Sequence, residues 1–402
     1  MIYRWLLLVP VLLGAPSVRA DDIAPLTLRR VVELAKSRAP AVSIARARVE
    51  EAGAGLVGAR RFATRNPVLA VDAGPRWEGD RSTDVQGSVS FPLDLGGRRD
   101  KRVAVAEATI GREQLDAENT QRDAIARAVV GYYQLLYAER GLALAEERVR
   151  LAQAAEDTAR QRTKAGDAPA FEVNLASGEV ARAEGTVAAA RAALARARGG
   201  LAVALGVPMS EIVVAGELAD RATLDGAPDA KTIRADLGVV AQEAKLAGAE
   251  ANLARGERSP SLDLRITYQH ERDAEIVLGG LAVSLPMFDR GQGDEAKARA
   301  RAKRAQAELV VRSTAISTQL ESARATYDAA LAAVRVYEDR AVPRSIENES
   351  AAAASYRAGK LELGSFLLIR REALETRREH LDRLLEAALA AVDLWIARGA
   401  TL

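Results

Sequence analysis

Most of the chain carries apolar residues spaced three and four positions apart, with charged residues between them. One such stripe runs through Ile125, Val129, Tyr132 and Leu136, and further stripes lie within 316–334 and 381–395. This spacing places the apolar residues on one face of a helix that packs along another helix. The sequence therefore predicts long helices in lateral contact.

Four short segments alternate apolar and polar residues instead, as strands do. Residues 67–73 and 85–93 flank one polar loop, and residues 261–268 and 276–285 flank another. Within 261–268, Leu262, Leu264 and Ile266 share one face. An apolar face opposite a polar face fits a half-buried soluble sheet or a membrane barrel with a wet interior. Periodicity alone favours the soluble sheet, because such sheets are commoner.

The two strand pairs and their flanking residues recur at a nearly fixed interval. Matching landmarks are 193 or 194 residues apart: Asn66-Pro67 with Ser259-Pro260, Ser90-Phe91-Pro92 with Ser284-Leu285-Pro286, Gly97 with Gly291, and Lys164-Ala165-Gly166 with Arg357-Ala358-Gly359. Landmarks that keep one offset over about 100 residues indicate an internal repeat. We therefore interpret the chain as a duplication, with one architecture used twice.

This interpretation divides the chain into a first repeat at 21–205, a linker at 206–230 and a second repeat at 231–398. Each repeat is expected to contain a helix, a β-hairpin, a long helix, a tip turn and a returning helix. In the first repeat the hairpin lies at about 67–93, the long helix at about 98–164 and the tip turn at 165–168. In the second they lie at about 261–286, 292–358 and 359–362. A helix over 98–164 would be roughly 100 Å long.

Glycine and proline mark the ends of these elements. Gly166 and Gly359 are expected to end the long helices, because glycine adopts the left-handed conformation found there, and the preceding cations Lys164 and Arg357 suit the negative end of the helix dipole. Pro343 should interrupt or kink the second long helix. At the junctions between strand and helix, we expect a proline to end strand pairing, at Pro92 and Pro286. A glycine should allow the change of direction, at Gly96-Gly97 and Gly291. The first long helix should begin in water with Arg98, Arg99, Lys101 and Arg102.

Composition narrows the function classes. Residues 1–20 have an early cation, an apolar core and small residues at Val18 and Ala20, which predicts a secretory signal peptide cleaved after Ala20. Without its two arginines the net charge is near zero, which argues against a nucleic-acid binder. The chain has no cysteine, so it has no disulfide, thiolate metal site or lipidated Cys.

Candidate chemistry is sparse. No phosphate-binding glycine loop, nucleophile motif or acid/base pair is evident, so no catalytic residue, cofactor site or metal site is assigned and an enzyme is disfavoured. His270 and His380 are the only histidines and form no cluster with metal-ligand spacing. The two hairpins have open strand edges and the long helices have apolar stripes, and both must be covered by other chains. A closed homo-oligomer would cover them. Four strands from each of several subunits would close a barrel.

In this order and spacing, the strand exits SFPLDLGGRR and SLPMFDRGQG and the tip motifs TKAGDAPAFEVNLA and YRAGKLELGSFLLI resemble the TolC family of outer-membrane efflux proteins, as does the Ala341-Val342-Pro343 break. The resemblance covers nearly the whole mature chain. It implies a mainly α-helical fold with a small β part, in which a homotrimer shares a twelve-stranded transmembrane barrel and a coiled-coil tunnel. It also implies a location in the outer membrane of a Gram-negative bacterium, with Leu262, Leu264 and Ile266 facing lipid. A periplasmic portion would meet an adaptor and an inner-membrane pump of the RND type at the tip turns.

The resemblance also implies a periplasmic entrance narrowed by acidic residues after each tip glycine. The matching positions here are Glu172, Ser365 and Leu368, of which only Glu172 is acidic; a solvated first-turn acid is the other reading of Glu172. The length and the missing lipidation Cys resemble the heavy-metal cation-efflux (CzcC-like) branch. An exit duct for drug efflux or type I protein secretion is the alternative. A periplasmic coiled-coil adaptor is more remote, because adaptors contain more strand.

Overall fold

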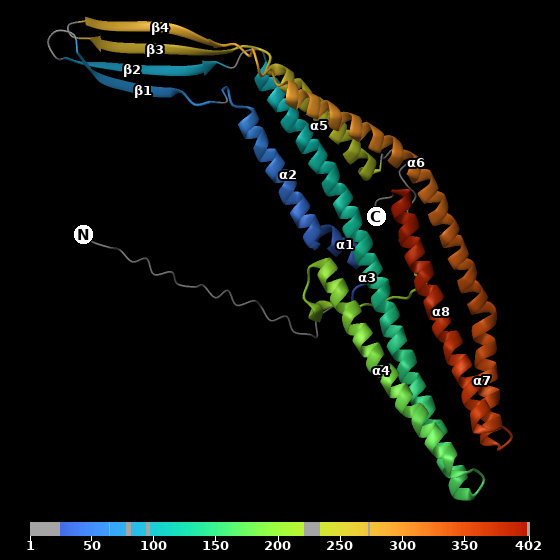
Figure 1. The fold of residues 1–402 in the computed structure, drawn as a ribbon. Coiled ribbons are helices and arrows are strands. Elements are labelled where there is room, and N and C mark those ends of the chain that lie inside the picture. The colour runs from blue at the N-terminus through green and yellow to red at the C-terminus, as the bar shows by residue number, and fades with distance from the viewer. Residues whose placement is uncertain are drawn as a thin grey trace, which may run out of the picture.

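The computed structural model describes residues 25–63, 65–77, 82–93, 97–220, 234–271 and 274–399. The predicted signal peptide (1–20), Gly96 and the end of the predicted linker (221–230) lie outside the described residues. The described chain is mainly helical with one small antiparallel sheet. The sheet stands at one end of a set of long helices, and the helical tips lie at the opposite end (Figure 1).

Two very long helical hairpins dominate the molecule. The first combines α3 and α4, and the second combines α6, α7 and α8, while the shorter α2 and α5 lie beside α3 (Figure 1). The helices are α1 Leu28–Arg38, α2 Pro40–Ala59, α3 Arg98–Ala165, α4 Ala170–Leu205, α5 Ala235–Gly256, α6 Gln292–Val336, α7 Val342–Arg357 and α8 Leu363–Arg398. At 68 residues, α3 is roughly 100 Å long. Among the described helices, none combines the length and apolar character that a membrane crossing requires.

The sheet contains β1 Val68–Arg76, β2 Ser82–Leu93, β3 Ser261–Glu271 and β4 Ala274–Ser284, in the order β1-β2-β3-β4. All three pairings are antiparallel, and β2–β3 joins the two hairpins. The sequence predicted the two hairpins but not this central pairing, because a β2–β3 contact joins residues far apart in the chain.

Glycines with positive φ occupy equivalent places in the two halves. Gly97 and Gly291 precede α3 and α6 with φ of 66° and 68°, and Gly166 and Gly359 follow α3 and α7 with φ of 82° and 69°. The structure adds a third pair, Gly206 and Gly399, which end α4 and α8 with φ of 68° and 70°. The two halves therefore have equivalent glycines at the strand exits, at the tips and at the ends of the final helices.

Pro343 alters the second long helix without ending it. A π-helical turn, Tyr337–Ala341, lies between α6 and α7, and the Val342 N–H donates to the Tyr337 carbonyl. A proline ring clashes with the carbonyl four residues earlier and cannot donate to it. One wider turn before Pro343 removes that conflict, so the regular α-helix is interrupted there and resumes as α7.

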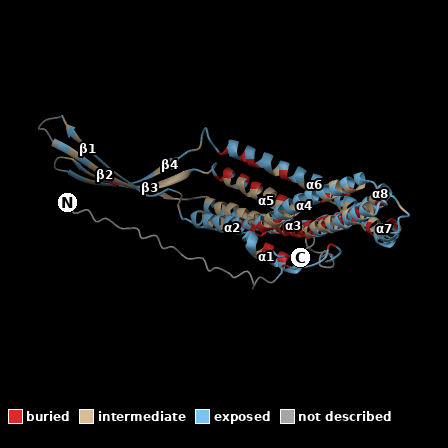
Figure 2. Ribbon diagram, turned by 90° about the horizontal axis from the view of Figure 1, so that it is seen from below, coloured by how far each residue is buried: buried red, intermediate tan, exposed pale blue. Residues whose placement is uncertain are grey.

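The main core lies at mid-length, where helices from both halves meet (Figure 2). There α1 packs on α3 and α4, and Trp395 of α8 is also buried. The first part of the predicted linker belongs to this core, because Ile212, Val214 and Leu218 are buried and Leu26 forms a parallel bridge to Val214. Two hydroxyl groups of α3 also bind this segment. The Tyr132 hydroxyl donates to Ala215 O at 2.8 Å, and the Tyr133 hydroxyl donates to Asp220 O at 2.7 Å. Residues 206–220 are thus a packed segment.

Candidate functional site: the two-faced sheet, its helix junctions and the helical tips

The register gives the sheet one strongly apolar face. Phe91 lies opposite Leu264, which lies opposite Leu281, and rows on either side repeat this chemistry. Ile266 is 49% exposed, and most of its neighbours on this face are also exposed. The face comprises Leu69, Val71, Ala73, Val85, Val89, Phe91, Leu93, Leu262, Leu264, Ile266, Tyr268, Val277, Leu281 and Val283. An uncovered surface of this size marks an interaction with a membrane or another protein.

The opposite face is largely polar and carries ion pairs. Arg76 pairs with Asp84 at 2.9 Å and with Glu271 at 2.8 Å near the loop end. Near the helix end, Arg65 pairs with Asp263 at 3.0 Å. Two strands depart from the pattern, since Ile276 and Leu278 of β4 and Val68 and Ala70 of β1 lie on this face. The two faces are therefore suited to different surroundings, one apolar and one aqueous.

The lengths of the four strands also suit strands that cross a bilayer. The strands contain 9, 12, 11 and 11 residues, and a tilted strand needs about 9–11 residues to cross a bilayer. The sequence-predicted Leu262, Leu264 and Ile266 all lie on the apolar face of β3.

At the first junction, the expectation for Pro92 is wrong. Pairing of β2 with β1 ends at Ser90, but pairing of β2 with β3 continues through Pro92 to Leu93. Proline is tolerated where a strand has lost one neighbour, because its missing N–H is not needed on that side. In the second half, β4 ends at Ser284, two residues before Pro286.

The cations that begin α3 are not simply solvated. Arg98 donates to Gly256 O at 3.1 Å and also to Ser259 O, at the end of α5 and in the link to β3. Arg99 donates to Arg60 O at 2.9 Å and Arg102 donates to Arg61 O at 3.0 Å, just beyond α2. Cations thus bind carbonyls at two helix C-termini, where the helix dipole is negative. These bonds tie α2, α3 and α5 together beneath the sheet.

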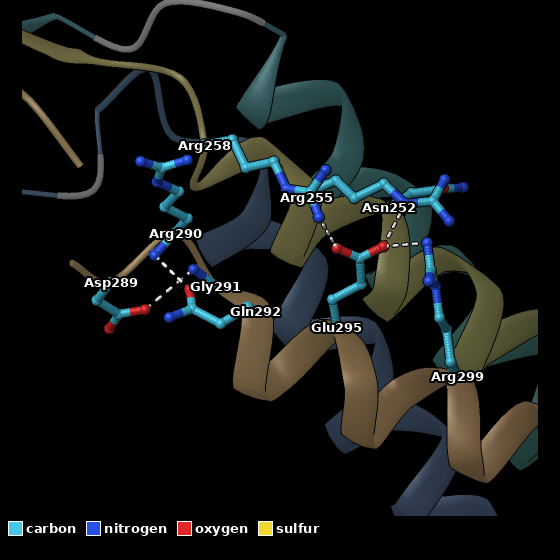
Figure 3. A network of polar contacts seen from close by, with 9 residues as sticks. All are labelled: Asn252, Arg255, Arg258, Asp289, Arg290, Gly291, Gln292, Glu295 and Arg299. Carbon is cyan, nitrogen blue, oxygen red and sulfur yellow. Dashed lines mark hydrogen bonds and ion pairs between the residues drawn. The ribbon is translucent and has the colours of Figure 1, made fainter. Parts of the chain in front are cut away.

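The second junction uses the opposite charge. Glu295, in the first turn of α6, is 3% exposed. Its carboxylate accepts from Arg255 at 2.7 Å and Arg258 at 2.6 Å, and pairs with Arg299 at 2.5 Å (Figure 3). The hydrogen bond from Arg255, helped by the charges of Arg258 and Arg299, holds the pKa of Glu295 below its ordinary value of 4.5. The sequence did not single out Glu295, because two of its three partners, Arg255 and Arg258, lie about 40 residues away.

We expect Glu295→Gln to destabilise the protein at neutral pH but not in acid. A depressed folded pKa contributes stability above the unfolded value, near 4.5, and this contribution is lost as pH falls through the folded pKa. Thermal unfolding of the purified protein from pH 7 to pH 3 should show a lower Tm for the variant at pH 7, with the difference shrinking as the pH falls below 4.5. Asp294→Asn, at the exposed neighbouring acid, is the control. A difference that persists unchanged at pH 3 would refute the charge-based role.

Gly291 permits the close approach of the second junction to α5. A Cβ added there would lie 2.4 Å from Ala254 O, and φ is +68°. Gly291→Ala should therefore lower the Tm, since the left-handed conformation alone costs about 1–2 kcal/mol. Gly293→Ala is a matched control, because a Cβ added at Gly293 would meet no atom of a neighbouring element within 4 Å and alanine favours a helix by up to about 1 kcal/mol. Equal effects of the two substitutions would contradict this reading.

The tips contain the turns that the sequence located. Gly166 N–H donates to Thr163 O at 3.1 Å, and Gly359 N–H donates to Tyr356 O at 3.1 Å. Lys164 and Arg357 are exposed beside these glycines. The tips therefore present two tight turns with exposed cations.

Behind the tips, an aromatic cluster holds the two helical hairpins together. Tyr356 of α7 stacks on Phe366 of α8 with ring centroids 4.7 Å apart. Arg162 of α3 lies over Tyr356 at 5.0 Å, and Arg370 of α8 lies over Phe366 at 4.3 Å and donates to Leu151 O of α3 at 2.6 Å. Burial raises the pKa of Tyr356, so its hydroxyl stays protonated at neutral pH.

A charged layer follows farther from the tips. Arg377 of α8 pairs with Glu147 of α3 at 2.7 Å and also with Glu349 of α7. Arg370 lies 3.7 Å from Glu349. The sequence did not single out these residues, although Arg370 and Arg377 are one heptad apart and so share a helix face.

The predicted entrance residues have different surroundings. Glu172, in the first turn of α4, is largely buried and lies 4.0 Å from Arg162. It is therefore not a fully solvated acid in the single chain. Ser365 is exposed and Leu368 is 59% exposed on α8. The chain thus brings Glu172 to the aromatic cluster and leaves the other two positions on the surface.

The histidines lie apart. His270 is exposed near the end of β3, and His380 Nε2 lies 3.6 Å from Glu338 in the π-helical turn. Across the described ranges, no group of three or more His, Cys, Asp or Glu side chains could hold a metal ion.

Comparisons with known proteins agree with this architecture. The family model described as outer membrane efflux protein matches residues 31–207, a span that falls almost wholly within the predicted first repeat. The cobalt-zinc-cadmium resistance protein CzcC of Cupriavidus metallidurans is 26% identical over 386 residues, covering 94% of this chain and 91% of CzcC.

Solved outer-membrane channels share the fold. OprN matches with a TM-score of 0.75 at 20% identity, over 93% of this chain and 90% of OprN. CusC matches with a TM-score of 0.75 at 18% identity, over 93% and 92%. VceC of Vibrio cholerae matches with a TM-score of 0.71 at 16% identity, over 93% and 96%. Residues 31–207 thus match the outer membrane efflux protein family, a family of transport ducts and not of enzymes, and the alignment with CzcC and the shared channel fold extend this similarity over most of the chain.

Proposed function

We propose that three copies of this chain form the outer-membrane channel of a tripartite efflux system. Each copy contributes its four strands to a twelve-stranded barrel, and the helices continue as a periplasmic tunnel. The observation that carries the proposal is the two-faced sheet, whose apolar face is left uncovered by the described chain. Lipid would cover that face, and the ion-paired face would line a wet interior.

The tips would meet the other components of the system. Gly166 and Gly359, with the exposed Lys164 and Arg357 beside them, form the surface that we assign to a periplasmic adaptor, and an inner-membrane pump of the RND type would deliver cargo through it. The channel would be passive. Glu172, Ser365 and Leu368 would border the periplasmic entrance, and the short distance from Glu172 to Arg162 supports an entrance with little net negative charge.

We further propose heavy-metal cations as the cargo. The support is the alignment with a protein named for cobalt, zinc and cadmium resistance over most of both chains. No metal-holding group occurs in the described part of this chain, which suits a duct that conducts ions without binding them specifically. An exit duct for drug efflux or type I protein secretion would use the same fold.

Growth of a deletion strain tests the cargo. Without this gene, growth should stop at lower concentrations of cobalt, zinc or cadmium, and the wild-type gene on a plasmid should restore resistance. Minimal inhibitory concentrations of a drug panel should stay unchanged. If only drug resistance falls, or only a secreted protein is retained, the metal assignment is wrong and the alternative duct is correct.

A further inference from the structure

We propose that the free edge of β4 and the hollow behind it seat β1 and the α2–β1 link of a second copy, with Val283 of one copy directly opposite Ala73 of the next. This register rests on the proposed trimer, since it describes how neighbouring copies join. It is a head-to-tail contact, which closes only as a ring.

The template for this contact is present within the chain. β2, the second strand of one hairpin, pairs with β3, the first strand of the other, with Val89 opposite Ile266. Beside this pairing, Arg98 donates to Gly256 O at the end of α5 and to Ser259 O in the α5–β3 link. Among the described strands, β4 and β1 each have one unpaired edge. Those edges are the second strand of the second hairpin and the first strand of the first hairpin.

The offsets of the repeat give the register of β4 against β1 of the next copy, starting from the β2–β3 pairing within the chain. Ser90-Phe91-Pro92 corresponds to Ser284-Leu285-Pro286 at an offset of 194, and Asn66-Pro67 corresponds to Ser259-Pro260 at an offset of 193. Applied to Val89 and Ile266, these offsets give Val283 and Ala73. Applied to Phe91 and Leu264, they give Leu285 and Val71.

The faces of the sheet provide an independent check. Ala73 lies opposite Val85, and Val283 lies opposite Leu262, so both belong to the apolar face. A slip of one residue would place Ala73 opposite Ala282, which pairs with Asp263 on the polar face. Because a one-residue slip exchanges the faces of a strand, the register derived from the repeat keeps the apolar face continuous between copies.

A hollow of 870 Å³ continues this edge toward the helices. Leu285, Met287 and Phe288 line it together with Arg258, and Phe288 is 91% exposed. In the first half, the equivalent place behind β2 is next to the α5–β3 link that Arg98 binds. The repeat assigns the hollow to the α2–β1 link of the next copy, which carries the exposed Phe62. Burying these apolar side chains would remove them from water.

The absence of cysteine from the sequence makes a disulfide test clean. Opposed residues of an antiparallel pair have Cα atoms about 4.5–5.5 Å apart, within disulfide range. We expect the full-length double variant Ala73→Cys with Val283→Cys, exported and oxidised, to run as a covalent trimer on a non-reducing gel and as a monomer after reduction. The matched control, Ala73→Cys with Ala282→Cys, should not cross-link, because its thiols lie on opposite faces. Each single variant should also give monomer.

Light scattering in detergent separates this proposal from the proposed function. A trimer in which the 73/283 pair stays uncross-linked, or in which the 73/282 pair cross-links instead, would overturn the register and leave the channel intact. Covalent dimers without trimers would overturn the ring. Monomers alone would overturn both proposals. If the first pair does not fold, Val71→Cys with Leu285→Cys tests the same register by the same outcomes.

Discussion

Arginine at both Leu264 and Ile266 should abolish assembly into the membrane. Both residues lie on the apolar face of β3, and each arginine near the bilayer midplane costs about 2–4 kcal/mol. The double variant should be missing from outer-membrane fractions and should accumulate as degraded or aggregated protein, as measured by immunoblotting of separated membranes.

The matched control places arginines on the other face. Gln86 and Ser88 belong to the polar face of β2, opposite Gln269 and Thr267. Gln86→Arg with Ser88→Arg should therefore still assemble. Harmless substitutions at Leu264 and Ile266 would mean that this face does not contact lipid.

Phe366→Ala should loosen the helical tips. Phe366 is 2% exposed and stacks on Tyr356 between two cation contacts. Truncating a buried phenylalanine costs about 3–5 kcal/mol. Because the cluster joins α7 and α8 to α3 and α4 near the tips, the loss should appear there first, as faster amide hydrogen exchange in residues 150–180 and 350–370.

Phe171 supplies the comparison for this prediction. It lies in the first turn of α4 and is 66% exposed, so Phe171→Ala should change stability by no more than about 0.5 kcal/mol. Equal exchange rates in the Phe366 and Phe171 variants would show that the aromatic cluster does not hold the hairpins together.

The features that the sequence predicted well have local physical causes. Glycine at positive φ is required by the backbone, so Gly97, Gly166, Gly291 and Gly359 can be located from their places at the ends of the repeated elements. Alternation along 261–268 likewise gives the apolar face of β3, because side chains alternate across a strand.

The features that it missed depend on distant partners. Nothing near Glu172 in the sequence indicates that it lies beside Arg162 on the other helix of its hairpin. Pro343 predicted an interruption or kink of the second long helix, but not that it would take the form of a π-helical turn at 337–341. The segment 206–220 reads as a linker because it falls between the two repeats, and its place in the core depends on tyrosines of α3.

Separation of membranes followed by sizing of the solubilised protein tests the central claim most directly. The full-length chain, expressed in a Gram-negative host, should sediment with the outer membrane, and light scattering in mild detergent should give the mass of three chains. Recovery as a soluble periplasmic monomer would contradict the account.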